Sequence, residues 1–247
     1  MSVPSAPFAG QTAVVTGASS GIGHAIARAL GDGGARLCLV GRRRPALAAF
    51  EGAGPAGDAE VLSYTADLAI ENEIRACAGA LQRDVGPIDI LVHSAGVIAL
   101  GAIATTPVDE LDRQYRVNLR APYLLTQCLL PLLEPRQGQI VFINSSIYLN
   151  TRALVGPYAA TKYALKALAD SLRLEVNPRG LRVLSIFPGQ TASPMQAAVH
   201  AGEGRFYRPE RLLQPADVAA TVVQALALPR TAEVTDIHIR PFQNSGA

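Results

Sequence analysis

The sequence predicts a single α/β domain spanning residues 1–247, with a doubly wound, mostly parallel seven-stranded sheet flanked by helices. Three observations favour this fold class. Short apolar runs alternate with longer helical patterns along the whole chain. Most of the apolar runs are nearly continuous, as in parallel strands that are covered on both faces. Glycine or proline lies near many of the boundaries between these segments.

Seven short apolar segments are predicted as strands: 12–16, 36–40, 60–64, 88–92, 139–144, 181–187 and 233–240. Five longer segments carry a helical pattern: 21–32, 70–84, 108–133, 157–177 and 215–228. Residues 190–214 follow a strand but show too little periodicity to be assigned. Because ligands of such sheets bind beyond the carboxyl ends of the strands, we expect about 190–214 to form a lid over the substrate.

Composition narrows the class of protein. Hydrophobic residues make up 49% of the chain and charged residues 17%, which excludes a disordered protein. The net charge of +2 does not suggest binding to nucleic acid. Three cysteines without a CxxC pair indicate a reducing compartment, and scattered histidines without an HExxH pattern indicate no metal site. Without an apolar run of membrane-spanning length or a secretion signal, we expect a cytoplasmic protein that does not contact membranes.

A glycine-rich turn follows the first predicted strand. Residues 16–23 read TGASSGIG, with glycines at 17, 21 and 23, and a helix begins there. Glycines allow the backbone to approach a pyrophosphate closely, and the helix start directs free N–H groups towards it. The spacing differs from GxGxxG and from a Walker loop. An ordinary turn with a glycine-rich helix start is the alternative.

The end of the second predicted strand indicates which dinucleotide would bind. This region reads VGRRR at 40–44 and lacks the acidic residue that usually holds an adenosine ribose. A guanidinium binds a phosphate well, whereas a carboxylate repels it. We therefore predict NADP(H) in preference to NAD(H), bound by Arg42 first and Arg43 second. A solvated basic loop is the alternative, and it is the interpretation we adopt for Arg44.

Tyr158 and Lys162 are four residues apart on a predicted helix, so their side chains share one face. A neighbouring ammonium favours the phenolate and is expected to lower the tyrosine pKa from about 10. This pair could supply a proton to a carbonyl oxygen. A tyrosine and a lysine at this spacing are common on amphipathic helices, and on the spacing alone that ordinary interpretation is preferred.

Taken together, the motifs resemble those of the classical short-chain dehydrogenases/reductases over essentially the whole chain. They occur in the family's order and spacing: TGASSGIG at 16–23, Asp67-Leu68, Ala95-Gly96, Asn118, Ser145, YAATK at 158–162 and Pro188-Gly189. The resemblance implies a Rossmann-type fold and an oxidoreductase that acts on CH–OH groups with NADP(H).

The resemblance also implies roles for four catalytic residues. Tyr158 would be the general acid/base. Lys162 would lower the pKa of Tyr158 and bind the nicotinamide ribose. Ser145 would hydrogen-bond the substrate oxygen, and Asn118 would hold a water that links Lys162 to solvent. Ser145 is preferred over the adjacent Ser146 because it lies thirteen residues before Tyr158, the usual gap in the family.

The remaining cofactor contacts follow in the same way. Asp67 and Leu68 would contact adenine, and Ala95-Gly96 would line the nucleotide. The segment from Pro188 to Ser193 would cradle the nicotinamide carboxamide. The complete expected cofactor set is Gly17, Ser19, Ser20, Gly21, Ile22, Gly23, Arg42, Arg43, Asp67, Leu68, Ala95, Gly96, Asn118, Tyr158, Lys162, Pro188, Gly189, Thr191 and Ser193.

One departure from the family pattern concerns the segment after the fourth strand. Where the family has Asn-Asn-Ala-Gly, this chain has HSAG at 93–96. His93 can be read as an extra catalytic base. A histidine at the end of a buried strand is more often a hydrogen-bonded core residue, and that is the interpretation we prefer.

The substrate pocket is expected to include Tyr148 and Met195. Arginines of the lid segment, Arg205, Arg208 and Arg211, are a hypothetical site for an anionic substrate group, with solvent-exposed surface arginines as the alternative. Family members are commonly tetramers that assemble through their long helices, so the resemblance implies a homotetramer or homodimer.

The leading hypothesis is an NADP(H)-dependent ketoreductase or secondary-alcohol dehydrogenase acting on a small molecule. One alternative is a related enzyme that dehydrates or epimerises its substrate. Another is a catalytically silent NADP(H)-binding sensor or structural protein of the same fold, which would need the glycines but no proton relay.

Overall fold

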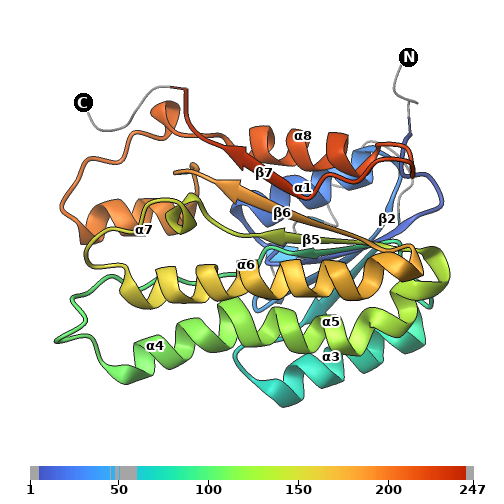
Figure 1. Cartoon of the computed structure of the whole chain (residues 1–247), viewed down its shortest axis with the longest axis horizontal. Coiled ribbons are helices and arrows are strands. Elements are labelled where there is room, and N and C mark those ends of the chain that lie inside the picture. The colour runs from blue at the N-terminus through green and yellow to red at the C-terminus, as the bar shows by residue number, and fades with distance from the viewer. Residues whose placement is uncertain (1–5, 45, 48–49, 51–59, 243–247) are drawn as a thin grey trace.

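Seven strands form one parallel sheet in the computed structural model, which describes residues 6–44, 46–47, 50 and 60–242 (Figure 1). The strand order is β3-β2-β1-β4-β5-β6-β7, and every neighbouring pair is parallel. The strands are β1 Thr12–Thr16, β2 Arg36–Gly41, β3 Val61–Thr65, β4 Ile90–His93, β5 Gln139–Ile143, β6 Arg182–Pro188 and β7 Asp236–Ile239. The predicted doubly wound Rossmann-type fold is confirmed.

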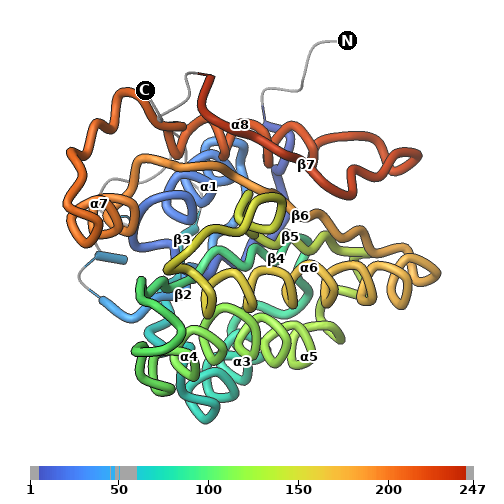
Figure 2. The backbone as a smooth tube through the Cα atoms, turned by 60° about the vertical axis from the view of Figure 1, so that its left-hand side comes forward, coloured from blue at the N-terminus to red at the C-terminus, as the bar shows by residue number. Residues whose placement is uncertain are grey.

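Helices cover both faces of the sheet (Figures 1 and 2). On one face α1 (Gly21–Asp32) packs against α8 (Pro215–Leu226), and their apolar residues share a core with β1 and β2. On the other face lie α3 (Glu71–Asp84), α5 (Ala121–Leu133) and α6 (Gly156–Val176), which bury a second apolar layer. Two covered faces explain why the strand sequences are nearly continuous in apolar residues.

The helix predicted over 108–133 is divided into three segments. It consists of α4 (Val108–Tyr115), a π-helical turn (Arg116–Arg120) and α5. Pro122 accounts for the change: in a regular α-helix its N–H would bond to the carbonyl oxygen of Asn118, and proline has no N–H. Asn118 therefore lies where the regular helical hydrogen bonding is interrupted.

The other differences from the predicted elements have local causes. β4 begins at Ile90 and not at 88, because the N–H of Ile88 donates to Leu132 of α5. β7 begins at Asp236 and not at 233, because the Glu233 side chain accepts the N–H of Val183 at 3.0 Å. The segment 190–214 contains a nine-residue helix, α7 (Pro194–Gly202), that its weak periodicity did not indicate.

The sheet has its topological switch point at β1. The chain moves from β1 to β2 and β3 on one side, then returns to β4 and continues outwards to β7 on the other. Loops that leave β1 and β4 therefore turn in opposite directions, and a crevice opens between their carboxyl ends. In Figure 1 the arrowhead of β6 points towards the end of the molecule where α7 lies. This end carries the candidate site.

His93, the last residue of β4, is a core residue. It is buried, its Nε2 lies 2.8 Å from Thr126 Oγ1, and its ring stacks on Phe142 with ring centroids 5.0 Å apart. Burial lowers the pKa of His93 to about 3. The interpretation as a hydrogen-bonded core histidine is supported over that of an extra base.

This shift in pKa predicts a dependence of stability on pH. Between pH 6.5 and about 3 the unfolded chain binds a proton on His93 that the folded chain does not, so the free energy of unfolding falls as the pH falls through that window. The contribution has a slope of about 1.4 kcal/mol per pH unit. His93→Gln keeps a hydrogen-bond partner for Thr126 without titrating. Chemical denaturation at several pH values should show that the free energy of unfolding falls less steeply with falling pH in this variant than in the wild type. Equal slopes would contradict this account.

Candidate active site

The carboxyl ends of β1 and β4 are held together by Thr16. Its hydroxyl accepts the N–H of Ser94 at 3.1 Å and that of Ala95 at 3.2 Å, and it donates to the carbonyl oxygen of Val92 at 3.3 Å. One buried side chain thus fixes the start of the loop after β4 against the glycine-rich turn. Sequence reasoning gave Thr16 no role, although it is the first residue of the TGASSGIG motif.

The glycine-rich turn has room only for glycine at two of its positions. Gly17 has φ +69°, and a Cβ there would lie 2.8 Å from the backbone of Ala95. A Cβ on Gly23 would lie 2.5 Å from the carbonyl oxygen of Gly17. The Ser20 side chain makes no capping hydrogen bond to the α1 N-terminus. The N–H groups of the first turn of α1 therefore face a shallow cradle that fits a pyrophosphate.

Arg42 and Arg43 follow β2 directly beside this cradle. The N–H of Gly17 donates to Val40 at 2.9 Å, and the N–H of Ala66 donates to Gly41 at 3.1 Å, so the ends of β1, β2 and β3 lie side by side. Both arginines are exposed, and in the described part of the chain neither guanidinium group forms a hydrogen bond or ion pair with another residue. Their guanidinium groups are available to an anionic ligand.

Asp67 shapes the turn that leads from β3 into α3. Its carboxylate accepts the N–H of Ala69 at 2.9 Å, and its own N–H donates to Glu73 at 2.7 Å. Leu68 beside it is buried. This turn follows β3, on the same side of the switch point as Arg42 and Arg43.

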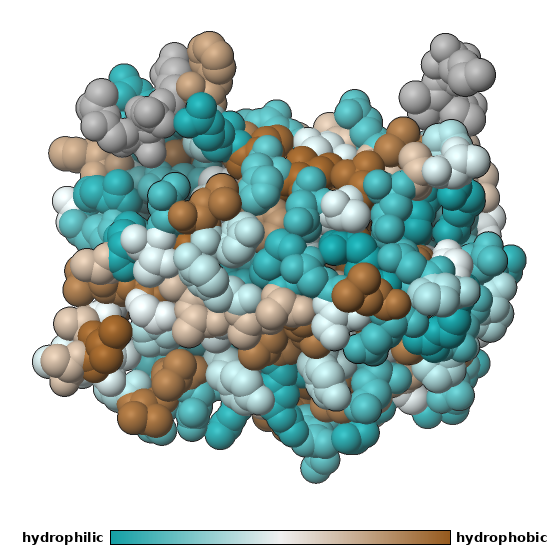
Figure 3. Space-filling view, in the orientation of Figure 1, coloured by the Kyte–Doolittle hydropathy of each residue, from teal (hydrophilic) through white to brown (hydrophobic). Residues whose placement is uncertain are grey.

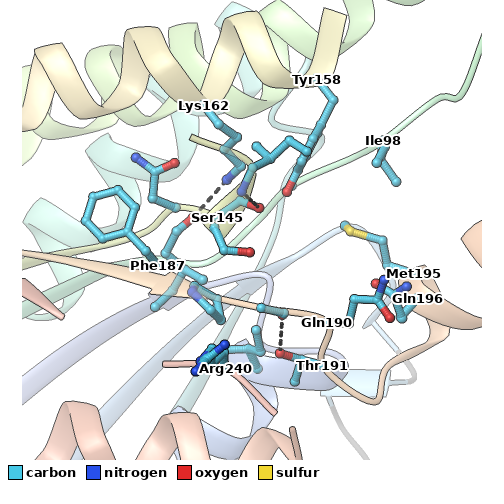
Figure 4. A pocket seen from close by; sticks show the side chains of 18 of the residues that line it. Ile98, Ser145, Tyr158, Lys162, Phe187, Gln190, Thr191, Met195, Gln196 and Arg240 are labelled. Carbon is cyan, nitrogen blue, oxygen red and sulfur yellow. Dashed lines mark hydrogen bonds between the residues drawn. The ribbon is translucent and has the colours of Figure 1, made fainter. Parts of the chain in front are cut away.

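Ser145, Tyr158 and Lys162 line one cavity of about 630 Å³ (Figure 4). Ser145 follows β5, and its Oγ accepts the N–H of Ile147 at 3.2 Å. Tyr158 and Lys162 lie on successive turns of α6, as their spacing predicted. Gln190, Thr191, Met195 and Arg240 lie across the cavity from them. The cavity thus joins residues that are far apart in the sequence, from Ile22 to Arg240.

Burial dominates the proton chemistry of this group. Burial raises the pKa of Tyr158, and the hydrogen bond from Ser145 offsets part of that rise. The pKa of Tyr158 is therefore shifted upwards, whereas a neighbouring Lys162 ammonium was expected to lower it. The Lys162 ammonium lies 5.8 Å from the centre of the Tyr158 ring and donates to the carbonyl of Ile143 at 2.9 Å. Burial lowers the pKa of Lys162 to about 8. Tyr158 therefore holds its proton firmly in this state.

Asn118 acts as a clamp beside the cavity. Its amide exchanges two hydrogen bonds with the backbone of Val97, both 2.8 Å long, and donates to Thr161 Oγ1 at 3.1 Å. Thr161 in turn donates to the carbonyl of Tyr158 at 2.8 Å. This network ties the loop after β4 to the first turn of α6. Thr161 was missed by sequence reasoning, although it lies within the YAATK motif.

The second serine and the predicted pocket tyrosine have different surroundings. Ser146 also lines the cavity, but the hydrogen bond to Tyr158 comes from Ser145. Tyr148 is not among the described residues that line the cavity. Its ring packs against Phe187 at 5.0 Å and Tyr163 at 5.5 Å between centroids. Tyr148 thus contacts the cavity through Phe187, which does line it.

The segment 190–214 contributes the opposite wall. Thr191 pairs with Leu213 in an isolated bridge, and Ser193 caps α7 by accepting the N–H of Gln196 at 3.2 Å. Met195 lines the cavity as expected. In the lid segment, Glu203 forms ion pairs with Arg205 and with Arg152, the latter at 2.6 Å. The ion pair with Arg152 links the end of α7 to the loop between Ser145 and Tyr158.

Two properties of the described residues bear on other classes of function. Among the residues that the structure describes, no group of three or more histidine, cysteine or acidic side chains is placed to hold a metal ion. No helix within residues 6–44 and 60–242 is long and apolar enough to cross a membrane.

The chain belongs to the short-chain dehydrogenase family, whose model matches residues 11–204. An uncharacterised oxidoreductase of Staphylococcus epidermidis is 35% identical over 234 residues, which are 94% of this chain and 97% of the relative. A glycine betaine reductase of Emericella nidulans is 33% identical over 244 residues. These are 97% of this chain, but this chain spans only 19% of that protein's length.

A solved structure supports the same assignment. A metagenomic short-chain oxidoreductase in complex with NADP superposes with a TM-score of 0.83 at 32% identity. The match covers 96% of this chain and all of the other. The family model, the similar oxidoreductases and the solved structure therefore all indicate the same fold and the same class of oxidoreductase.

Proposed function

We propose that this protein is an NADP(H)-dependent oxidoreductase that interconverts a ketone or aldehyde and the corresponding alcohol. The observation that carries the proposal is the arrangement of Ser145, Tyr158 and Lys162 around one cavity that reaches the glycine-rich turn at Ile22. A nucleotide sensor would need the turn but not this proton donor with its hydrogen-bonded partner.

The residues at the crevice fit the cofactor. The cradle at Gly17 and Gly23 excludes any Cβ, and the α1 N-terminus offers N–H groups to a pyrophosphate. Arg42 and Arg43 would hold the 2′-phosphate that distinguishes NADP(H) from NAD(H). Asp67, Leu68, Ala95 and Gly96 would line the adenosine end, and Pro188, Gly189, Thr191 and Ser193 the nicotinamide end. The structure of the similar metagenomic oxidoreductase was solved in complex with NADP.

When bound, the nicotinamide supplies or accepts the hydride. Tyr158 donates a proton to the substrate carbonyl oxygen, and its raised pKa keeps that proton in place until the oxygen becomes basic. The Ser145 hydroxyl donates a hydrogen bond to the same oxygen and fixes its position. The oxidation direction uses the same groups in reverse, with Tyr158 as the base.

Lys162 and Asn118 would return a proton to Tyr158. Lys162 has a pKa of about 8, so its ammonium can exchange protons near neutral pH. The carbonyl of Asn118 lacks its regular helical donor because residue 122 is proline, and it could hold the water expected there. The clamp on Val97 fixes this carbonyl beside α6.

The segment 190–214 would act as the lid, with α7 over the cavity.

The cytoplasmic location expected from the sequence stays a prediction. The assembly would be a homodimer or homotetramer formed through α4, α5 and α6. Large hydrophobic side chains are exposed there, at Tyr115, Tyr123 and Leu174. Figure 3 shows hydrophobic side chains among hydrophilic ones over this face.

The proposed reaction is tested by steady-state kinetics of Tyr158→Phe. The wild type should oxidise NADPH in the presence of a panel of ketones, aldehydes and oxo acids. Loss of the general acid should reduce kcat by about a hundredfold to ten-thousandfold while NADPH still binds. A variant with wild-type turnover would refute the role of Tyr158, and absence of turnover in the wild type would count against the reaction.

The cofactor preference is tested by Arg42→Ala, with Arg44→Ala as the matched control. Loss of a charge-assisted contact to the 2′-phosphate should raise the KM for NADPH by about tenfold or more, and the KM for NADH should change little. The Arg44 variant should resemble the wild type. An equal rise for both cofactors in the Arg42 variant would show that Arg42 does not read the 2′-phosphate.

The assembly is tested by sedimentation equilibrium. We expect a mass two or four times that of one chain, because exposed aromatic and aliphatic side chains on neighbouring helices favour burial against a second copy. A species with the mass of a single chain at micromolar concentration would contradict the proposed homo-oligomer.

A further inference from the structure

The cavity that holds Tyr158 has an uneven charge. Of the described residues that line it, none is Asp or Glu, whereas Arg152, Lys162 and Arg240 are basic. The wall also contains apolar side chains, among them Ile98, Val155 and Met195. A cavity with this lining favours a ligand that has an apolar body and a negative charge.

Two of the three basic groups already have partners. Lys162 donates to the carbonyl of Ile143 at 2.9 Å and lies beneath Tyr158. Arg152 is paired at 2.6 Å with Glu203, which Arg205 also contacts, so its guanidinium group already has a carboxylate partner within the protein. Arg240 differs from both. In the described part of the chain it has no hydrogen-bond or ion-pair partner.

The position of Arg240 separates it from the phosphates of the cofactor. It directly follows β7, the outermost strand on the side of the sheet away from β2 and β3. The glycine-rich turn follows β1, and Arg42 follows β2, so the phosphate sites lie towards the other half of the sheet. Arg240 instead lies against Gly189 at the end of β6, where a Cβ on Gly189 would be 3.4 Å from its Cα.

The distance to the reaction centre sets the size of the ligand. Ser145 follows β5 and Arg240 follows β7, so two strand spacings, about 10 Å, separate their backbones. Figure 4 shows Arg240 on the wall opposite Ser145 and Tyr158. A carboxylate on Arg240 would therefore be several bonds from a carbonyl carbon at Tyr158.

We infer that the substrate is an oxo acid whose carboxylate binds Arg240 while its carbonyl oxygen meets Ser145 and Tyr158. This inference rests on the proposed function and specifies its substrate class. It replaces the lid arginines as the anion site: Arg205 is paired with Glu203, and Arg208 and Arg211 are not among the described residues that line the cavity. A guanidinium also recognises the planar carboxylate in a fixed orientation.

The test compares oxo acids with their methyl esters at saturating NADPH. Suitable probes are pyruvate, levulinate and 6-oxoheptanoate, in which the carboxylate is progressively farther from the carbonyl. The longer acids should be reduced with a higher kcat/KM than their esters, and pyruvate should show no such preference. Arg240→Gln should lower kcat/KM for the preferred acid by about tenfold or more, mainly through KM.

Controls separate this role from others. Arg240→Gln should leave the ester kinetics and the KM for NADPH unchanged, and Arg240→Lys should retain part of the preference for the acid. Arg208→Gln, which removes an exposed lid cation, should behave as wild type. A rise in the KM for NADPH, or an equal loss for acid and ester in Arg240→Gln, would overturn the inference.

The inference and the proposed function fail in different ways. If esters and neutral ketones are reduced without preference for the acids, the inference fails and the reductase assignment stands. If no compound is reduced, the proposed function fails. Isothermal titration of 6-oxoheptanoate and its ester into wild type and Arg240→Gln then decides the inference alone: tighter binding of the acid that is lost in the variant supports it, and equal binding refutes it.

Discussion

The candidate site depends on the close approach of two loops at the switch point of the sheet. Thr16 accepts two N–H groups from the loop after β4, and Gly17 lies so near Ala95 that no side chain fits between them. Because the sheet order reverses at β1, the two loops diverge beyond this contact and leave a crevice. The cradle for phosphates and the cavity at Tyr158 both open from this crevice.

Burial, more than charge pairing, sets the chemistry inside the cavity. Tyr158 is kept protonated because its phenolate would be poorly solvated, and Lys162 loses part of its affinity for a proton for the same reason. The pKa of Tyr158 is thus raised and that of Lys162 lowered, which is the opposite of what an ion pair between the two groups would produce. The network from Asn118 through Thr161 to Tyr158 holds this geometry.

Much of the fold and part of the geometry of the candidate site could be predicted because they depend on local patterns. Apolar runs located all seven strands, and the spacing of Tyr158 and Lys162 placed both on one face of α6. Features that depend on distant contacts could not be predicted. The π-turn before Pro122, the short helix α7, the packing of Tyr148 on Phe187 and the position of Arg240 at the cavity follow from tertiary neighbours.

The central claim is that one crevice orients NADP(H) so that the nicotinamide reaches the cavity of Ser145 and Tyr158. A crystal structure of the protein with NADP⁺ bound tests it most directly. The account predicts the pyrophosphate at the α1 N-terminus, the 2′-phosphate on Arg42 and the nicotinamide beside Tyr158. A nucleotide bound elsewhere, or one whose nicotinamide points away from Tyr158, would contradict it.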